Sequence, residues 1–303
     1  MRSLDIVELK NPVLMPAIRS GLSRPKLLIS GFASDGKPHP AFVLRRHSGD
    51  SGDSPASKPE RHLRGEWIYG GVFFGHWGHF LLESLARIWM LQSIDAPKII
   101  WHSFNPSRSM IPWQRCLLDL VGVSTAEHYF VRKPTLVDKL QVPEPGYVLG
   151  KSFNYSQMCA MSVYPFLNVQ RGRKLWLSRS RLEPEEPVGQ GVLESSLSSH
   201  GWTIFHPQEH SPEVQLNKMS QAEIIGGFEG SAFHTLILGS DIRARIRIVN
   251  KRPAIGLNYH IIASAKKMNQ VVCRIPLAYS HSQGGKMIYR LKDVSAAVDL
   301  IDM

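Results

Sequence analysis

The sequence predicts an α/β protein with two doubly wound domains, each built on a parallel sheet. Short apolar runs alternate with longer stretches of helical periodicity, and this alternation occurs twice along the chain. Pro143 and Pro145 close the first block. The chain has 303 residues, 43% of them hydrophobic, which is enough for two cores of ordinary size. We therefore expect one domain over residues 1–150 and a second over residues 151–303.

The first block begins its regular structure after a segment that is unsuited to packing. Residues 45–61 are rich in Ser, Gly and Pro and contain almost no apolar side chains, which predicts an exposed flexible loop. The patterns that follow predict, in order, a strand and turn over 65–74, a long helix over 76–92, a strand over 99–103, a helix ending at Gly122 and a strand over 135–143.

The second block repeats the alternation. Its patterns predict a helical or mixed stretch over 152–170, a strand within 173–182 that enters a basic loop, a helix over 194–200, a strand over 202–207, a helix over 211–222 capped by Ser211, a strand, glycine loop and helix over 223–239, strands over 246–249 and 271–275, and a closing amphipathic helix over 291–303. Packing of this last helix against the first domain is one option.

The charge, the cysteines and the apolar windows of the sequence argue against several classes of protein. The formal net charge of +11 favours anionic ligands, but no block of five or more basic residues is present, which argues against nucleic acid as a partner. The three cysteines are far apart and odd in number, so they indicate neither a disulfide framework nor a zinc knuckle. The N-terminal residues lack the apolar core of a signal peptide, and no window has the 18 apolar residues of a membrane span. We expect a soluble cytoplasmic protein whose basic surface can rest against a membrane that carries its acceptor.

The predicted helix over 76–92 carries one narrow titratable stripe. At helical spacing His76, His79, Glu83 and Arg87 fall within an arc of about 80°. The rest of the circumference is largely apolar. A helix that is buried nearly all round and has one such stripe usually lines a cleft.

Three interpretations of the stripe remain open. In the first, His79 or Glu83 is a general base and the neighbouring group orients it; we favour His79, because Arg87 stabilises the ionised form of Glu83. In the second, Glu83 and Arg87 form a structural ion pair. In the third, His76, His79 and Glu83 bind a metal in a hydrolase, but the spacing differs from that of zinc protease helices. We expect no metal site.

Two segments of the second block are candidates for binding phosphate. The run over 223–239 predicts a strand, a turn through Gly230 and a helix beginning at Ser231 or Ala232, so free backbone N–H groups face an anion. Glycine also ends strands for steric reasons alone. Arg179 and Arg181 follow an apolar strand. At that position two guanidinium groups can clamp phosphates; a solvated basic loop without a ligand is the alternative interpretation.

Taken together, these pieces resemble the glycosyltransferase 61 family, and we expect a bacterial member of the capsular-polysaccharide type. The resemblance rests on GHWGHFLLESLARIW, on LLDLVGV followed by KPTLVDKLQVPEPG, on LWLSRSRL, and on the run from Leu193 to His234. It extends over about 175 residues, from roughly residue 65 to residue 240, with the motifs in the family's order.

The resemblance implies a GT-B arrangement, in which two Rossmann-like domains face each other across a cleft. It implies an inverting transfer from a nucleotide-sugar donor to a hydroxyl of a glycan or other acceptor, with no cofactor. The donor would lie mainly on the second domain, at Arg179, Arg181, Glu229, Gly230, Ser231, Ala232 and His234, and the acceptor mainly on the first, near Arg87 and the base.

Two positions depart from the family pattern. The family usually has a histidine where this chain has Glu229, whose carboxylate would repel a nearby phosphate. In the helix that follows, this chain has His234 and Thr235 where Asn or Thr is common in the family. An inactive relative that binds glycan or nucleotide therefore remains an alternative.

Overall fold

The chain forms two compact units, residues 1–160 (unit 1) and residues 161–303 (unit 2), in a computed structural model. The structure describes residues 2–20, 26–42, 45–46, 49–50, 57–104, 110–182, 187–252, 254–283 and 286–303. The division falls later than the predicted boundary at 150/151, because helix α4 (Tyr155–Met161) inserts the buried side chain of Gln157 into unit 1. Of the predicted loop over 45–61, residues 47–48 and 51–56 lie outside the described residues.

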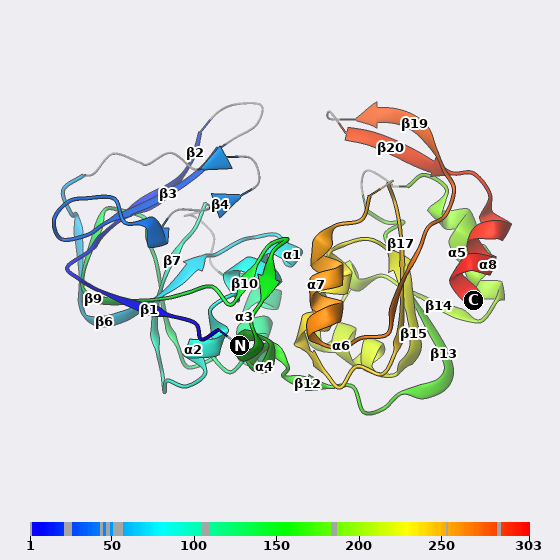
Figure 1. Cartoon of the computed structure of the whole chain (residues 1–303), viewed down its shortest axis with the longest axis horizontal. Coiled ribbons are helices and arrows are strands. Elements are labelled where there is room, and N and C mark those ends of the chain that lie inside the picture. Colours follow the sequence, from blue (N-terminus) through cyan, green and yellow to red (C-terminus); the bar gives the residue numbers. More distant parts are fainter. Residues whose placement is uncertain are drawn as a thin grey trace. The chain divides into compact units, whose positions relative to one another are not determined.

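Unit 1 is built on a mixed sheet with the strand order β3-β2-β9-β6-β7-β8 (Figure 1). Strands β9, β6, β7 and β8 run parallel, whereas β1 and β2 both pair antiparallel with β9. The prediction of a purely parallel sheet is therefore wrong for this unit, because the N-terminal strands close its edge. The strands of this sheet are β1 (Ile6–Lys10), β2 (Val13–Ser20), β3 (Lys26–Phe32), β6 (Arg61–Val72), β7 (Lys98–His102), β8 (Glu127–Phe130) and β9 (Thr135–Pro143); β4 (Arg45–Arg46) pairs with β5 (Gly49–Asp50), and β10 (Tyr147–Val148) with β11 (Ser152–Phe153), in two separate two-stranded sheets.

The predicted long helix over 76–92 is broken in the structure. It consists of α1 (Trp77–His79), a π-helical segment η2 (Phe80–Ser84), a turn, and α2 (Ile88–Leu91). At the break, Gln157 Nε2 donates to the carbonyl of Leu85 at 2.6 Å, its Oε1 accepts from Trp89 N at 3.1 Å, and Gly146 N donates to Ala86 O at 2.7 Å. These partners replace the helical hydrogen bonds that the turn loses. Unit 1 also contains η1 (Pro40–Phe42) and α3 (Pro112–Leu120).

Unit 2 is built on a parallel sheet with the strand order β14-β13-β15-β17-β18, which confirms the predicted parallel pattern in this half of the chain. Numbered along the chain from β13, the order is 2-1-3-4-5, one of the two common doubly wound arrangements. The strands are β13 (Gln170–Leu177), β14 (Trp202–Phe205), β15 (Ala222–Phe228), β17 (Arg245–Val249) and β18 (Gln270–Cys273), with the short pair β12 (Tyr164–Pro165) and β16 (Gly239–Ser240) beside them and the hairpin β19 (Leu277–Gln283) and β20 (Lys286–Leu291).

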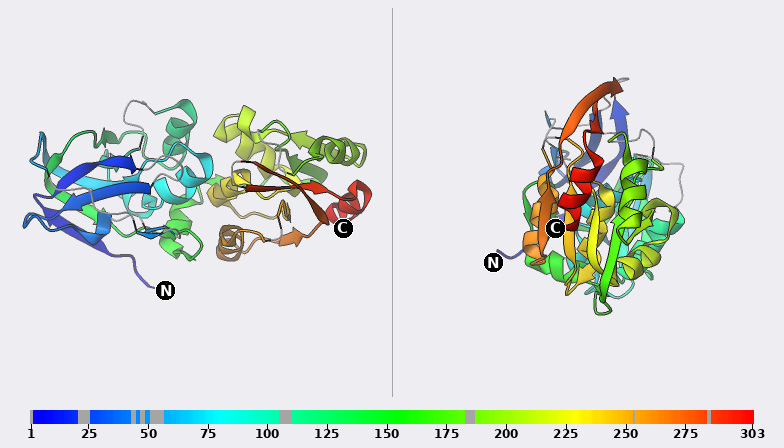
Figure 2. Two further views of the ribbon diagram at one scale, coloured as in Figure 1. Left: turned by 90° about the horizontal axis from the view of Figure 1, so that it is seen from above. Right: turned by 90° about the vertical axis from the view of Figure 1, so that its right-hand side faces the viewer.

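Helices cover both faces of this sheet (Figures 1 and 2). One face carries α5 (Gln190–Ser199) and α8 (Val294–Asp302), whose apolar side chains share a core with Trp176 and Trp202. The other carries η3 (Pro207–Glu209), α6 (Pro212–Ser220), the 3-10 helix η4 (Ser231–Leu238) and α7 (Leu257–Ala265). Ser211 caps α6 as predicted.

The closing helix α8 belongs to unit 2. Val298 and Ile301 are buried against α5, and Trp202 Nε1 donates to Asp302 at 2.7 Å. The apolar face of this helix is thus covered within its own unit. Among the residues that the structure describes, no helix is long and apolar enough to cross a bilayer.

Candidate active site

In unit 1 the titratable stripe is held at the carboxyl end of strand β6. Ser84, in the π-helical segment, is buried; its hydroxyl donates to Val72 O at 2.8 Å and accepts from Phe74 N at 2.9 Å. The His79 ring lies 5.5 Å from the Phe74 ring. These contacts attach the first two turns to the strand end, which is where doubly wound folds place their functional groups.

His79 and Glu83 form a hydrogen-bonded pair. Nδ1 of His79 lies 2.5 Å from Oε2 of Glu83. Because a carboxylate only accepts, Nδ1 donates in this hydrogen bond, and in the neutral ring the lone pair lies on Nε2. Side-chain exposure is 40% for His79 and 15% for Glu83, so the histidine faces the surface with the carboxylate behind it. The pair has the geometry of a general base with its orienting group.

His76 joins this pair at the edge of the stripe. It is the exposed N-cap residue of α1, and its ring lies 5.2 Å from the ring of His79. Within the described residues, no three His, Cys, Asp or Glu side chains are arranged to hold a metal ion.

Arg87, the fourth member of the predicted stripe, is directed elsewhere by the break in the helix. Its Nε donates to Pro143 O at 2.9 Å, and its guanidinium lies 5.3 Å from the centre of the Tyr69 ring. The expected arc of four residues is therefore reduced to three, because the π segment and the turn change the rotation per residue before Arg87.

In unit 2 the candidate phosphate site lies at the switch point of the sheet. The chain passes from β13 to β14 on one side and then returns to β15 on the other side of β13. The loops that follow β13 and β15 therefore diverge at the carboxyl edge, and ligands of doubly wound sheets bind in the crevice at that point. Arg179 lies on the first of these loops and Gly230 on the second.

Arg179 and Gly230 are in direct contact. A Cβ atom on Gly230 would lie 2.5 Å from Nη1 of Arg179, so no other residue fits there without displacing the guanidinium. Gly230 is also the N-cap of η4, with extended backbone. The absence of a side chain at this position thus brings a guanidinium and the start of a helix together, which suits a diphosphate.

The carboxylate of Glu229, next to this contact, is paired with an arginine. The side chain is 1% exposed, and its carboxylate lies 3.3 Å from Nε of Arg252, which follows strand β17. Tyr259, on α7, lies in the same group: burial, with a further contribution from Glu229, raises the pKa of its phenol well above the usual value, and Arg179 and Arg252 oppose this rise. Two arginines, a glutamate and a tyrosine thus converge near Gly230.

The remaining predicted residues take different places. His234 stacks on Tyr259 with ring centroids 5.3 Å apart, and Ser231 and Ala232 form the partly buried first turn of η4, which is a 3-10 helix and not an α-helix. Arg181 is exposed, and its Nη1 lies 2.8 Å from both carboxylate oxygens of Glu209. The structure therefore brings Arg179, Glu229, Gly230 and His234 together, and it pairs Arg181 with η3.

Sequence reasoning did not find Arg252 or Tyr259. Arg252 follows a parallel strand, as Arg179 does, so the same rule about carboxyl ends would have found it. Tyr259 gives no such signal, because it reaches the site from the first turn of a helix that the periodicity did not predict.

The family model described as Glycosyltransferase 61 matches residues 77–246, more than half of the chain. The match includes His79, Glu83, Arg179 and the turn at Gly230, and it ends before Arg252 and Tyr259. No curated protein matches the sequence.

Proposed function

Because the chain belongs to the glycosyltransferase 61 family and is a glycosyltransferase, we propose that it transfers a sugar, with inversion and without a metal, from a nucleotide-sugar donor to a hydroxyl group of a glycan. A bacterial capsular polysaccharide or its precursor is the acceptor class that fits the resemblance. The contact of Arg179 with Gly230 at the switch point carries this proposal, because it supplies positive charge and helix N–H groups where a diphosphate would bind.

In the proposed reaction His79 is the general base. Nε2 accepts the proton of the acceptor hydroxyl while the acceptor oxygen forms its bond to the anomeric carbon of the donor. The bond from that carbon to the phosphate oxygen breaks on the opposite face, and its electron pair leaves with the diphosphate. Glu83 stabilises the imidazolium that forms, and Arg179 offsets the charge of the leaving group. The reaction requires the two units to face each other across a cleft, which is the GT-B arrangement.

An inactive relative is the second candidate, and Glu229 is the residue that suggested it. The ion pair with Arg252 weakens that suggestion, because the carboxylate that would repel phosphate has a guanidinium beside it.

Nucleoside diphosphate binding tests the donor site. We expect a nucleoside diphosphate to raise the melting temperature in the presence of EDTA, because arginine and backbone N–H groups, and not a metal, hold the phosphates. Arg179→Ala should weaken binding by about 1.5–3 kcal/mol, the contribution of a charge-assisted hydrogen bond. The measurements are thermal shift over a panel of nucleotides and calorimetric titration.

Arg181→Ala is the matched control. Arg181 is paired with Glu209, and its replacement changes the net charge by the same amount as Arg179→Ala. Equal weakening in both variants would show that only overall charge matters, and stabilisation that disappears with chelator would contradict the metal-free mechanism. Tight donor binding without transfer to any acceptor would favour the inactive relative.

A further inference from the structure

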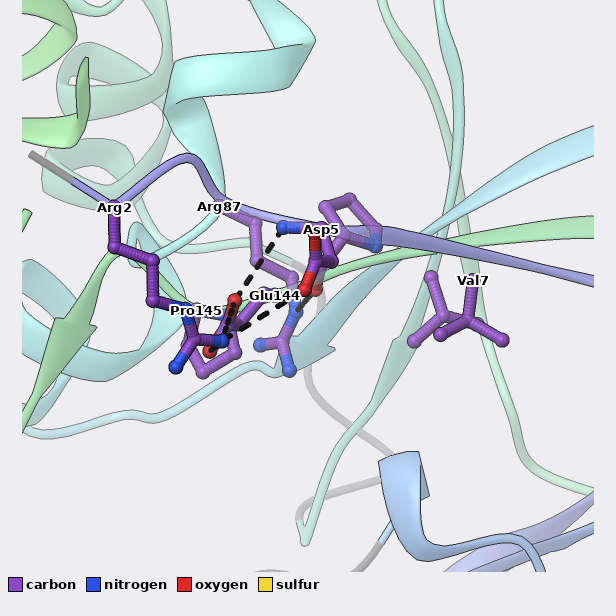
Figure 3. A pocket seen from close by; sticks show the side chains of 8 residues that line it. Arg2, Asp5, Val7, Arg87, Glu144 and Pro145 are labelled. Atoms are coloured by element: carbon purple, nitrogen blue, oxygen red, sulfur yellow. Dashed lines mark hydrogen bonds and ion pairs between the residues drawn. The ribbon is translucent and has the colours of Figure 1, made fainter.

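A pocket in unit 1 contains an arginine whose charge has no carboxylate partner among the described residues. The pocket has a volume of about 270 Å³ and is lined by Arg2, Asp5, Val7, Arg87, Val142, Pro143, Glu144 and Pro145. Figure 3 shows Arg2, Arg87, Glu144 and Pro145 converging on it. The three chain segments that form it, at residues 2–7, at Arg87 and at residues 142–145, belong to the same unit.

The two arginines of this pocket differ in their partners. Arg2 binds both oxygens of Glu144, at 2.8 and 2.9 Å, and lies 3.8 Å from Asp5. Arg87 uses Nε for the carbonyl of Pro143, and within the described residues its two terminal nitrogens make no hydrogen bond. Arg2 is therefore paired with carboxylates, whereas Arg87 has no carboxylate within ion-pair distance among the described residues.

The surroundings hold Arg87 in this position. Gly71 has φ +101°, and a Cβ atom there would lie 2.5 Å from Nη1, so only glycine leaves room for the guanidinium. The centre of the Tyr69 ring lies 5.3 Å from the carbon of the guanidinium. Burial lowers the pKa of Arg87, and among the described residues Tyr69 opposes this decrease. A half-buried guanidinium with no carboxylate beside it is costly, so an anion that enters the pocket gains an interaction that the described residues do not supply.

The lining indicates the rest of the ligand. The carboxylates of Asp5 and Glu144 accept hydrogen bonds from hydroxyl groups, and the two valines and two prolines offer apolar surface to C–H groups. The volume is below the ~300–1,000 Å³ of pockets for drug-sized molecules, which suits one sugar residue and not an oligosaccharide. An anion, hydroxyl groups and a C–H face occur together in a uronic acid.

We propose that this pocket binds one carboxylate-bearing sugar residue, with its carboxylate on the terminal nitrogens of Arg87. The assignment of that sugar to the acceptor glycan rests on the proposed function; the binding of the sugar does not.

Binding of methyl β-D-glucuronide to the full chain, followed by saturation-transfer NMR and calorimetric titration without donor, tests the proposal. We expect the glucuronide to bind and the neutral methyl β-D-glucoside to bind at least 10-fold more weakly, since a charge-assisted contact is worth about 10- to 100-fold in affinity. Arg87→Met should cause a loss of the same size. Arg115→Gln, at an exposed arginine of the same unit, should cause none.

Val7→Trp provides a second variant in case Arg87→Met does not fold. Val7 is 41% exposed and lines the pocket, so a larger side chain there fills the pocket without entering the core. Equal binding of the two glycosides, or glucuronide binding that survives Val7→Trp or a folded Arg87→Met, would overturn the proposal. Inorganic phosphate that binds more tightly than the glucuronide, and depends on Arg87, would overturn the sugar assignment. These measurements contain no nucleotide. A negative result for the sugar pocket is therefore independent of a negative result for the proposed donor site.

Discussion

At the scale of single residues, the pair of His79 and Glu83 defines the proposed chemistry of unit 1. The hydrogen bond of 2.5 Å fixes the tautomer of the imidazole and leaves Nε2 as its only proton acceptor. The histidine is the more exposed of the two groups, so in the proposed mechanism it meets the substrate and the carboxylate orients it.

Replacement of these two residues should separate their roles. His79→Gln removes the base, and we expect turnover to fall by about 10²–10⁴-fold, the usual contribution of a general base. Glu83→Gln leaves the imidazole in place and should cost less, with the pH profile of turnover displaced because the imidazolium loses its partner. Steady-state kinetics with titration of the donor nucleotide provide the measurements.

The affinity for donor nucleotide is the internal control, since the proposed donor site lies on unit 2. Loss of donor affinity in either variant would assign the stripe a structural role. Full activity of both would move the base elsewhere, with His76 and His234 as the next residues to test.

At the scale of elements, the break after η2 decides which side chains share a face. Its stability depends on Gln157, which is fully buried and bonds to the backbone on both sides of the turn. The side chain of Gln157 thus replaces helical hydrogen bonds at Leu85 and Trp89, which lie 72 and 68 positions away from it in the sequence.

Gln157→Leu should destabilise unit 1 by about 2–3 kcal/mol, because it keeps the volume but leaves a carbonyl and an N–H group buried without partners. Urea unfolding followed by tryptophan fluorescence measures this loss. Gln170→Leu, at an exposed position, is the control and should change stability by less than about 0.5 kcal/mol. If the two variants have equal stability, the turn at residues 85–87 does not need its glutamine.

The same break shows where prediction from sequence ends. Local patterns predicted β6, β9, β13, β15, the cap at Ser211 and the closing helix, because apolar periodicity and capping residues act within a few positions of the chain. The break and the redirection of Arg87 were not predictable in this way, since both depend on Gln157, Gly146 and Pro143, which are distant in sequence. Likewise Arg179 was found from its strand, but its contact with Gly230 required the strand order.

At the scale of the whole molecule, the two units have separate cores, and we expect them to differ in sensitivity to acid. His102 and His128 both lie in unit 1, and burial lowers the pKa of each to about 4. His102 is fully buried, with Nδ1 2.7 Å from the Tyr69 hydroxyl and Nε2 2.9 Å from the Met15 carbonyl. Both rings are therefore neutral in the folded unit over a pH range in which they are protonated when it unfolds.

The sign of the pH effect follows from this difference. A histidine with a folded pKa below its unfolded value of about 6.5 stabilises the fold fully above pH 6.5 and loses that contribution as the pH falls towards 4. For His102 the loss amounts to about 3 kcal/mol, and for the partly exposed His128 to less. Calorimetry between pH 7 and pH 4 should show the transition of unit 1 moving to lower temperature ahead of that of unit 2.

His102→Asn should flatten the pH dependence of unit 1, whatever its effect on absolute stability. His200→Asn, at an exposed position of unit 2, is the matched control. An unchanged slope in His102→Asn would mean that other groups cause the acid sensitivity.

The pair of Glu229 and Arg252 also constrains the order in which this chain's ancestors acquired it. The side chain of Arg252 is 59% exposed and that of Glu229 is 1% exposed. Without its partner the arginine would be solvated by water, whereas the glutamate would be an unpaired charge in the interior, which destabilises the fold. A lineage that begins with a neutral residue at 229 can therefore gain the arginine first and the glutamate afterwards, but the reverse path passes through a destabilised intermediate. Loss runs in the opposite order, with Glu229 replaced before Arg252. A descendant that carries the glutamate without the arginine should therefore be rare.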